Sequence, residues 1–146
     1  MNTANSYLRI VVPEGTALDE IIIENDAGDL NISSVAAEKI TIDIDAGNVD
    51  IGGVTVKKLG IDADAGNIEI ADSTLDKLEA NVDAGNLSIK GSSIESLYAD
   101  IDAGNIDTEN CDIAGGSCKT DLGNIALHGN IGDVSTEVSL GNVESD

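Results

Sequence analysis

Pairs of aspartates separated by one residue recur along this chain and could supply oxygen ligands to a metal ion. They stand at Asp43-Ile44-Asp45, Asp62-Ala63-Asp64 and Asp100-Ile101-Asp102. Side chains two apart on a strand point to the same face, so each pair offers two carboxylates, and calcium prefers oxygen ligands of this kind. We therefore expect a candidate calcium site at Asp62, Asp64, Asp100 and Asp102, the single cofactor that the sequence suggests.

Known calcium-binding loops do not match these pairs. An EF-hand loop carries glycine at its sixth place and a bidentate glutamate at its twelfth, whereas glycine here falls at the fifth place. The calcium-binding nonapeptide of other β-rolls is also absent from the sequence. A solvated acidic face without bound metal therefore stays open as the alternative.

Two cysteines and one histidine are the other candidates for chemistry. Cys111 and Cys118 could form a disulfide in an oxidising compartment or remain two buried thiols; we favour buried thiols, because the place of Cys118 in the repeat described below is apolar in most other copies. Zinc needs more Cys or His ligands than the chain contains. A general base needs an orienting partner, so we expect His128 to be an exposed corner residue, and no catalytic residue is predicted.

The elements that position these side chains follow a repeat of nineteen residues. The sequence Asp-Ala-Gly-Asn stands at 45–48, 64–67, 83–86 and 102–105, with variants at 26–29, 121–124 and 139–142. We number each repeat from its first residue, so the glycine is at position 3. These glycines fall at 28, 47, 66, 85, 104, 123 and 141, five steps of nineteen followed by one of eighteen. A fixed period of this size is typical of a solenoid.

Alternating aliphatic residues indicate three short strands in each repeat. Positions 5 and 7 form the first, position 12 marks the second, and positions 15, 17 and 19 form the third. Apolar residues two apart predict a strand with one buried face, glycine at position 3 suits a corner with positive φ, and asparagine at position 4 can form a ladder between coils. The predicted fold is all-β: a parallel β-solenoid, or single-stranded β-helix, right-handed, with coils of about 19 residues.

We expect one domain over residues 1–146. Residues 1–25 form an N-terminal coil, 26–138 the regular coils of nineteen residues, and 139–146 an incomplete last coil. The last sheet edges would then be uncovered, which makes self-association through sheet edges a further expectation.

Charge and hydropathy exclude some partners. The net charge is -21, with 28 acidic residues against seven Lys and Arg, so nucleic acid would be repelled. No stretch reaches the length of a membrane span, and Met1 to Ser6 lacks the basic and apolar regions of a signal peptide. We therefore expect no direct membrane insertion of this segment.

The ends of the array carry further features of a known family. Ile10-Val11-Val12-Pro13-Glu14-Gly15-Thr16 precedes the seven glycine-centred turns, and Val138-Ser139-Leu140-Gly141-Asn142-Val143 follows at the end. With these features the chain resembles a bacterial family of adhesin-like β-solenoid domains of unknown function. The resemblance implies a non-enzymatic, extracytoplasmic domain at the cell surface or envelope, often placed after a membrane anchor. Aspartate at position 1 departs from the Ser, Thr or small polar residue that is more frequent in that family.

Three functions remain for comparison. The first is a structural or binding module whose partner is a surface protein or a polysaccharide. The second is a scaffold or regulatory domain in envelope stress signalling, which the sequence does not separate from the first. The third is a polysaccharide-active β-helix enzyme, but glycoside hydrolysis needs a cleft between two carboxylates in different environments. Nearly identical coils without inserted loops predict no such cleft, so we expect that the protein is not an enzyme.

Overall fold

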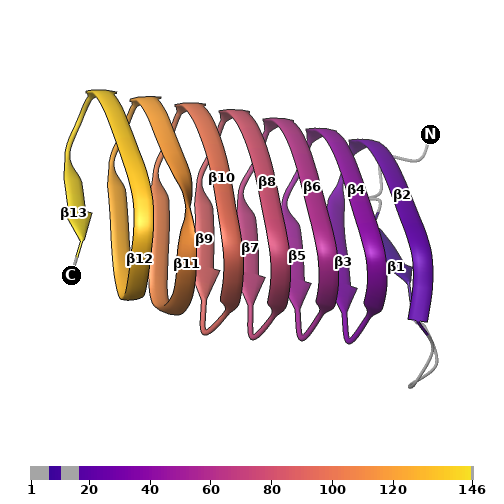
Figure 1. Ribbon diagram of the computed structural model, residues 1–146. Helices are drawn as coiled ribbons and strands as arrows, with labels where there is room; N and C mark the ends of the chain where they lie inside the picture. The colour runs from indigo at the N-terminus through magenta and orange to yellow at the C-terminus, as the bar shows by residue number, and fades with distance from the viewer. Residues whose placement is uncertain (1–6, 11–16, 146) are drawn as a thin grey trace.

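The computed structural model describes residues 7–10 and 17–145, which form a rod of stacked coils (Figure 1). Most coils consist of a short strand followed by a long one, and no helix occurs in the described residues. The strands are β1 (Tyr7–Ile10), β2 (Ala17–Ala27), β3 (Asp29–Ser33), β4 (Ala36–Ala46), β5 (Val49–Gly52), β6 (Thr55–Ala65), β7 (Ile68–Ala71), β8 (Thr74–Ala84), β9 (Leu87–Lys90), β10 (Ser93–Ala103), β11 (Ile106–Leu122), β12 (Ile125–Leu140) and β13 (Val143–Ser145).

Every pairing between these strands is parallel and joins equivalent positions of successive coils. The short strands run in the order β1, β3, β5, β7, β9 and the long strands in the order β2, β4, β6, β8, β10, and β11 joins both series. Val49 pairs with Ile68, and Asp43 pairs with Asp62, nineteen residues later in each case. The predicted all-β parallel solenoid with coils of about 19 residues is confirmed. Its right-handed winding and its domain limits stay predictions.

The number of strands in a coil differs from the expectation of three. Positions 12 and 15 to 19 lie in one strand of eleven residues, such as β6. Lys57 and Lys58 are both exposed within that strand, whereas their neighbours Val56 and Leu59 are buried. Two consecutive outward side chains let the strand turn a corner while its backbone pairing continues on both sides, so the predicted corner does not divide it.

The core consists of aliphatic rows along the rod. Positions 5, 7, 12, 15, 17 and 19 are buried in the middle coils, as expected. Position 10 adds a buried row that the sequence pattern did not indicate: Val35, Val54, Ser73, Ser92 and Cys111. The serines belong there because their hydroxyls bond locally. Ser73 Oγ donates to the carbonyl of Ala71 at 2.8 Å, and Ser92 Oγ donates to that of Lys90 at 2.9 Å.

Glycine is required at position 3 of the coils. Gly47, Gly66, Gly85 and Gly104 have φ between 144° and 154°, a region that L-residues with a side chain rarely adopt. A methyl group on Gly66 would also overlap the carbonyl oxygen of Gly47 in the preceding coil. Both observations confirm the predicted corner, and they show that the coils approach each other there too closely for any side chain.

The asparagines at position 4 form the predicted ladder. The backbone N–H and the Nδ2 amide of Asn86 both donate to Oδ1 of Asn67, at 3.2 and 3.1 Å. The same pattern joins successive coils from Asn48 to Asn124, and the backbone N–H of Asn142 extends it to the last coil. At the first step the acceptor is the Asp29 carboxylate, which receives both the backbone N–H and the Nδ2 amide of Asn48 at 3.1 Å.

Candidate functional site

The outward side of the long strands carries hydrogen-bonding groups in register from coil to coil, and we call it the long-strand face. It consists of positions 14, 16 and 18 of β4, β6, β8 and β10. Position 14 begins with a row of lysines, position 16 is mixed, and position 18 is mainly acidic. The members are Lys39, Lys58, Lys77 and Ser96 at position 14, Thr41, Gly60, Glu79 and Tyr98 at position 16, and Asp43, Asp62, Asn81 and Asp100 at position 18.

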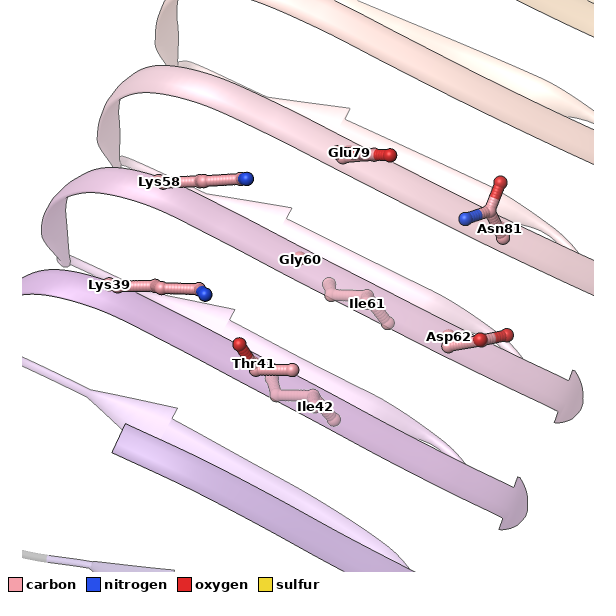
Figure 2. Close-up of a pocket in the computed structure, with 9 residues that line it drawn as sticks. All are labelled: Lys39, Thr41, Ile42, Lys58, Gly60, Ile61, Asp62, Glu79 and Asn81. Carbon is pink, nitrogen blue, oxygen red and sulfur yellow. The ribbon is translucent and has the colours of Figure 1, made fainter. Parts of the chain in front are cut away.

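A hollow of about 250 Å³ lies on this face over Gly60. Because Gly60 has no side chain, the row of position 16 is interrupted between Thr41 and Glu79. Figure 2 shows Lys39 and Lys58 on one side of the hollow and Asp62 and Asn81 on the other. A second hollow of about 250 Å³ follows along the rod between Glu79, Tyr98, Asp100 and Lys119. The two hollows share Glu79 and Asn81, so together they extend over neighbouring coils.

The lysines of this face differ in their partners. Lys39 Nζ lies 3.8 Å from Glu20 Oε2, and Lys77 Nζ lies 4.0 Å from Glu79 Oε2. Lys77 also lies over the ring of Tyr98, 5.2 Å from its centroid, a cation–π contact. Within the described part of the chain Lys58 makes no ion pair. The Lys58 ammonium beside the first hollow is therefore the one best placed to bind an added anionic or hydroxyl group.

The calcium candidates lie in two separate pairs. Asp62 and Asp64 belong to β6, Asp100 and Asp102 belong to β10, and β8 lies between them with Asn81 in the row of Asp62 and Asp100. Nowhere in residues 7–10 and 17–145 do three or more His, Cys, Asp or Glu side chains converge as a metal site would require. Each place thus offers two carboxylate ligands, and calcium binding there stays one alternative beside a solvated acidic face without bound metal.

Asp62 has a carboxyl whose pKa is raised in the folded protein. Partial burial raises the pKa of its carboxyl above the ordinary value of 3.8, and the carboxylates of Asp43, Asp64 and Asp83 raise it further. Asp43 is the direct neighbour of Asp62 in the preceding coil. Burial and the stacking of Asp62 on Asp43 thus disfavour the ionised form of Asp62.

The comparison with known families gives one match. A family model described as Toastrack DUF4097 matches residues 1–143. The chain belongs to this family. The search of curated proteins and the search of solved structures found no match. The expected β-solenoid domain of unknown function is confirmed by the family and the fold.

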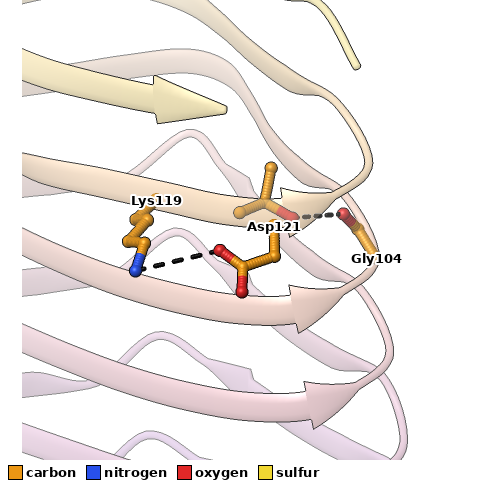
Figure 3. Close-up of polar contacts among 4 residues, drawn as sticks. Gly104, Lys119 and Asp121 are labelled. Carbon is orange, nitrogen blue, oxygen red and sulfur yellow. Dashed lines mark hydrogen bonds and ion pairs between the residues drawn. The ribbon is translucent and has the colours of Figure 1, made fainter. Parts of the chain in front are cut away.

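The acidic row of the Toastrack domain changes toward the C-terminal end. Lys119 stands at position 18 between Asp100 and Glu137 of the adjoining strands, and its Nζ lies 3.8 Å from Asp121 Oδ1 (Figure 3). The neighbouring Thr120 occupies a core row, and its hydroxyl donates to the carbonyl of Gly104 at 3.1 Å. A basic residue thus separates two acids here, in contrast to the direct stacking of Asp43 on Asp62.

The cysteines of the Toastrack domain are buried free thiols, as favoured from the sequence. Cys111 Sγ donates to the carbonyls of Ile89 and Glu109, each at 3.3 Å. Burial raises the pKa of the Cys111 thiol, and it raises the pKa of Cys118 to about 12. Since the thiolate is the nucleophile, neither residue is activated.

His128 departs from its predicted exposure, because its side chain is half-buried. The residue follows the buried Leu127 at the end of the short-strand segment of β12, and its backbone N–H donates to Thr108 Oγ1 at 3.1 Å. This bond ties the corner to the preceding coil.

Within the described residues, no helix has the length and apolarity that crossing a membrane requires.

Proposed function

We propose that this Toastrack domain is a non-enzymatic, adhesin-like structural and binding module at the bacterial surface or envelope. It holds a surface protein or a polysaccharide against the long-strand face. The observation that carries the proposal is the face itself, where ammonium, hydroxyl, amide and carboxylate groups recur in register from coil to coil. The spacing between coils is that of neighbouring strands, about 4.8 Å, so the face can make repeated contacts with an extended ligand.

A polysaccharide fits this face better than a compact substrate. The two hollows lie side by side, and they place Lys58 and Asp62 beside the first and Tyr98 beside the second. Tyr98 is 43% exposed, and a tyrosine ring offers an apolar surface together with a polar hydroxyl. Sugars present the same combination of C–H faces and hydroxyl groups. Hydrogen bonds from several coils would then hold successive sugar units.

The same geometry gives little support to catalysis. Glycoside hydrolysis uses one carboxyl with a raised pKa and a second, ionised one on opposite sides of the bond. Asp62 has a raised pKa, but the carboxylates that raise it lie along the same acidic rows of one sheet. A ligand on the long-strand face would meet these groups from one side only.

Binding to purified bacterial cell-wall polysaccharide, fixed to a sensor surface, tests the proposal. We expect binding by the unaltered protein and at least a tenfold loss of affinity in the double variant Lys58→Ala/Tyr98→Ala. The control Lys90→Ala removes one lysine from β9, outside the face, and should leave the affinity unchanged. Equal losses in both variants would show that net charge, not the face, is responsible.

Two further outcomes separate the alternatives. Release of new reducing ends from the polysaccharide would overturn the non-enzymatic proposal. Binding to an immobilised envelope-protein fraction but not to polysaccharide, with the same sensitivity to Lys58→Ala/Tyr98→Ala, would favour a scaffold in envelope stress signalling. Proteolysis of intact cells tests the location, because a surface domain is digested without lysis of the cell.

A further inference from the structure

Two rows of opposite charge run along the long-strand face. At position 14, Lys58 is paired in register with Lys39 on one side and with Lys77 on the other. At position 18, Asp43 is paired with Asp62. Four residues of extended strand separate the two positions, which corresponds to about 13 Å at a rise of about 3.3 Å per residue. The face therefore has a positive edge and a negative edge over β4 and β6.

The two rows do not neutralise each other. Their separation of about 13 Å exceeds the Debye length of about 8 Å at physiological ionic strength, so the charges are largely screened from one another. Among the described residues, Lys58, Asp43 and Asp62 take part in no ion pair. Lys39 pairs with Glu20 of the neighbouring strand and not with an aspartate of position 18. Charges of both signs are thus left for a ligand.

The adjoining row at position 13 shows how charges in register can instead connect the coils. There the charges alternate in sign, because Lys57 stands between Glu38 and Asp76. The Nζ of Lys57 lies 3.0 Å from Oε2 of Glu38 in the preceding coil. Like charges stacked in register repel each other, so the rows at positions 14 and 18 oppose the stacking of the coils. Ligand binding gives these two rows a role that stability does not.

The hollow over Gly60 lies between the two charged rows. Two successive strands present the same order across the face, a cation, an uncharged residue and an anion. These residues are Lys39, Thr41 and Asp43 in β4, and Lys58, Gly60 and Asp62 in β6. Figure 2 shows the lysine side chains of these strands extended toward Thr41 and Gly60. In β8 the order is interrupted, because Glu79 stands at position 16 and its Oε2 lies 4.0 Å from the Nζ of Lys77.

Charge complementarity selects among the polymers that could lie on this face. A polymer with anionic groups alone is repelled by the row of position 18 and by the net charge of -21. A polymer with cationic groups alone is repelled by the lysines of position 14. An uncharged polymer gains nothing from the separation of the two rows. A polymer with carboxylate groups on one edge and ammonium groups on the other matches both rows.

We propose that the ligand of the long-strand face is a zwitterionic polysaccharide, one that carries both carboxylate and ammonium groups. This inference rests on the proposed function, because it names the class of polysaccharide that the face binds. The Lys58 ammonium donates to a carboxylate of the ligand, and Asp62 accepts from an ammonium of the ligand, both charge-assisted hydrogen bonds. A sugar ring occupies the hollow of about 250 Å³ over Gly60, between these two contacts.

Calorimetric titration with polymers of one backbone type tests the proposal. Carboxymethyl chitosan carries amino and carboxyl groups, its N-acetylated derivative carries carboxyl groups without the amines, and glycol chitosan carries amines alone. At pH 6 and about 0.15 M NaCl, the protein should bind carboxymethyl chitosan about tenfold more tightly than the acetylated derivative. Lys58→Gln and Asp62→Asn should each lower the affinity for carboxymethyl chitosan about tenfold. Asp62→Asn should not lower the affinity for the acetylated derivative, which has no ammonium for Asp62.

Matched controls separate the two rows from net charge. Lys90→Gln and Asp107→Asn make the same charge changes at exposed positions of the short strands, and they should leave the affinity for carboxymethyl chitosan unchanged. Glycol chitosan should respond equally to Asp62→Asn and Asp107→Asn if net charge alone attracts it.

Three outcomes would overturn the inference: no binding of carboxymethyl chitosan, equal affinity for its acetylated derivative, or equal losses in the variants and their controls. The proposed function is judged separately, by the binding of cell-wall polysaccharide and its loss in Lys58→Ala/Tyr98→Ala. Binding of that polysaccharide without a preference for carboxymethyl chitosan would leave the proposed function standing and reject the zwitterionic ligand.

Discussion

At the scale of single residues, the glycine at position 3 sets how closely coils can stack. Its φ near 150° excludes side chains on conformational grounds, and the carbonyl oxygen of the glycine in the preceding coil occupies the space of a Cβ. Gly60 is different, because it has no such φ and its nearest neighbour to a Cβ, the carbonyl oxygen of Ile40, lies at 4.0 Å. The backbone therefore excludes a side chain at position 3, whereas it leaves room for one at Gly60.

We expect Gly66→Ala to lower the free energy of unfolding by at least about 3 kcal/mol, because backbone strain and overlap add. Gly60→Ala should change it by less than about 1 kcal/mol, and in the stabilising direction, since the new methyl restricts the unfolded chain and meets its nearest neighbour, the Ile40 carbonyl oxygen, at an ordinary van der Waals distance. Urea denaturation of both variants measures the difference. Similar losses in the two variants would contradict the role assigned to position 3.

The asparagine ladder has a direction, which a charge-changing substitution can test. In Asn86→Asp the side chain still accepts from Asn105 but no longer donates to Asn67 Oδ1. A carboxylate oxygen then faces that acceptor, so we expect a loss of about 1 to 2 kcal/mol. Asn110→Asp, an exposed residue outside the ladder, is the control for charge. Equal losses of stability in thermal melts of the two variants would contradict a contribution of the asparagine ladder to stability.

At the scale of strands, stability resides in the rows that stack inside the rod. Ile68 and Leu87 are 1% and 0% exposed and pair directly in successive short strands. Replacing either by alanine should cost about 2 to 4 kcal/mol, because the cavity lies between like residues of adjacent coils. Glu79→Ala, on the outward side of β8, should cost under about 0.5 kcal/mol. Chemical denaturation of the three variants checks this order, and equal losses would mean that inward and outward positions are wrongly assigned.

The acidic row of position 18 makes stability depend on pH in a definite direction. The carboxyl pKa of Asp62 is raised in the folded protein, mainly by burial and then by Asp43, Asp64 and Asp83. A carboxyl with a raised folded pKa disfavours folding while it is ionised, so its contribution improves as the pH falls through that pKa. Asp62→Asn should therefore be more stable than the wild type at pH 7, and the difference should disappear at pH values below the ordinary 3.8.

Asp100→Asn is the matched control for this experiment, because the neighbours of Asp100 in its row are Asn81 and Lys119. It should show little gain at pH 7. Thermal melts at pH 7 and pH 3.5 measure both differences. A destabilised Asp62→Asn variant at pH 7 would mean that the carboxylate makes a favourable interaction that outweighs the repulsion.

At the scale of the whole molecule, the net charge of -21 is spread over columns that run along the rod. Monovalent salt should raise the melting temperature gradually, because it screens stacked charges in the folded state more than the expanded chain. Since the structure gathers the calcium candidates only in pairs, we expect calcium and magnesium to stabilise equally at matched ionic strength. Thermal melts in each ion measure this.

A preferential effect of sub-millimolar calcium would contradict that expectation and support calcium sites. Calcium tolerates irregular geometry better than magnesium, and a specific site stabilises by mass action. Loss of the calcium effect in Asp62→Asn/Asp64→Asn would then assign it to β6, and its loss in Asp100→Asn/Asp102→Asn would assign it to β10.

The sequence by itself determined the architecture, because a solenoid repeats one local solution. Glycine at position 3, asparagine at position 4 and the aliphatic alternation each recur at a fixed interval, so pairing in register follows from the period alone. Burial of Ile68, the φ of Gly66 and the bonds of Asn86 were all predictable in this way. The candidate calcium residues could also be placed on strands, because their spacing of two assigns them to one face.

Only the tertiary structure decided what depends on neighbours that the period does not encode. The period does not show whether a strand ends at a corner. In β6 the side chains of Lys57 and Lys58 both point outward, and the strand continues through the corner. Ser73 can be buried because its hydroxyl donates a hydrogen bond to the carbonyl of Ala71. The polarity of serine alone does not predict this burial. The hollow over Gly60 and the separation of Asp62 from Asp100 by Asn81 arise from deviations within rows. The effect of such a deviation depends on the stacking of the coils, because each side chain lies beside residues nineteen positions away in the sequence.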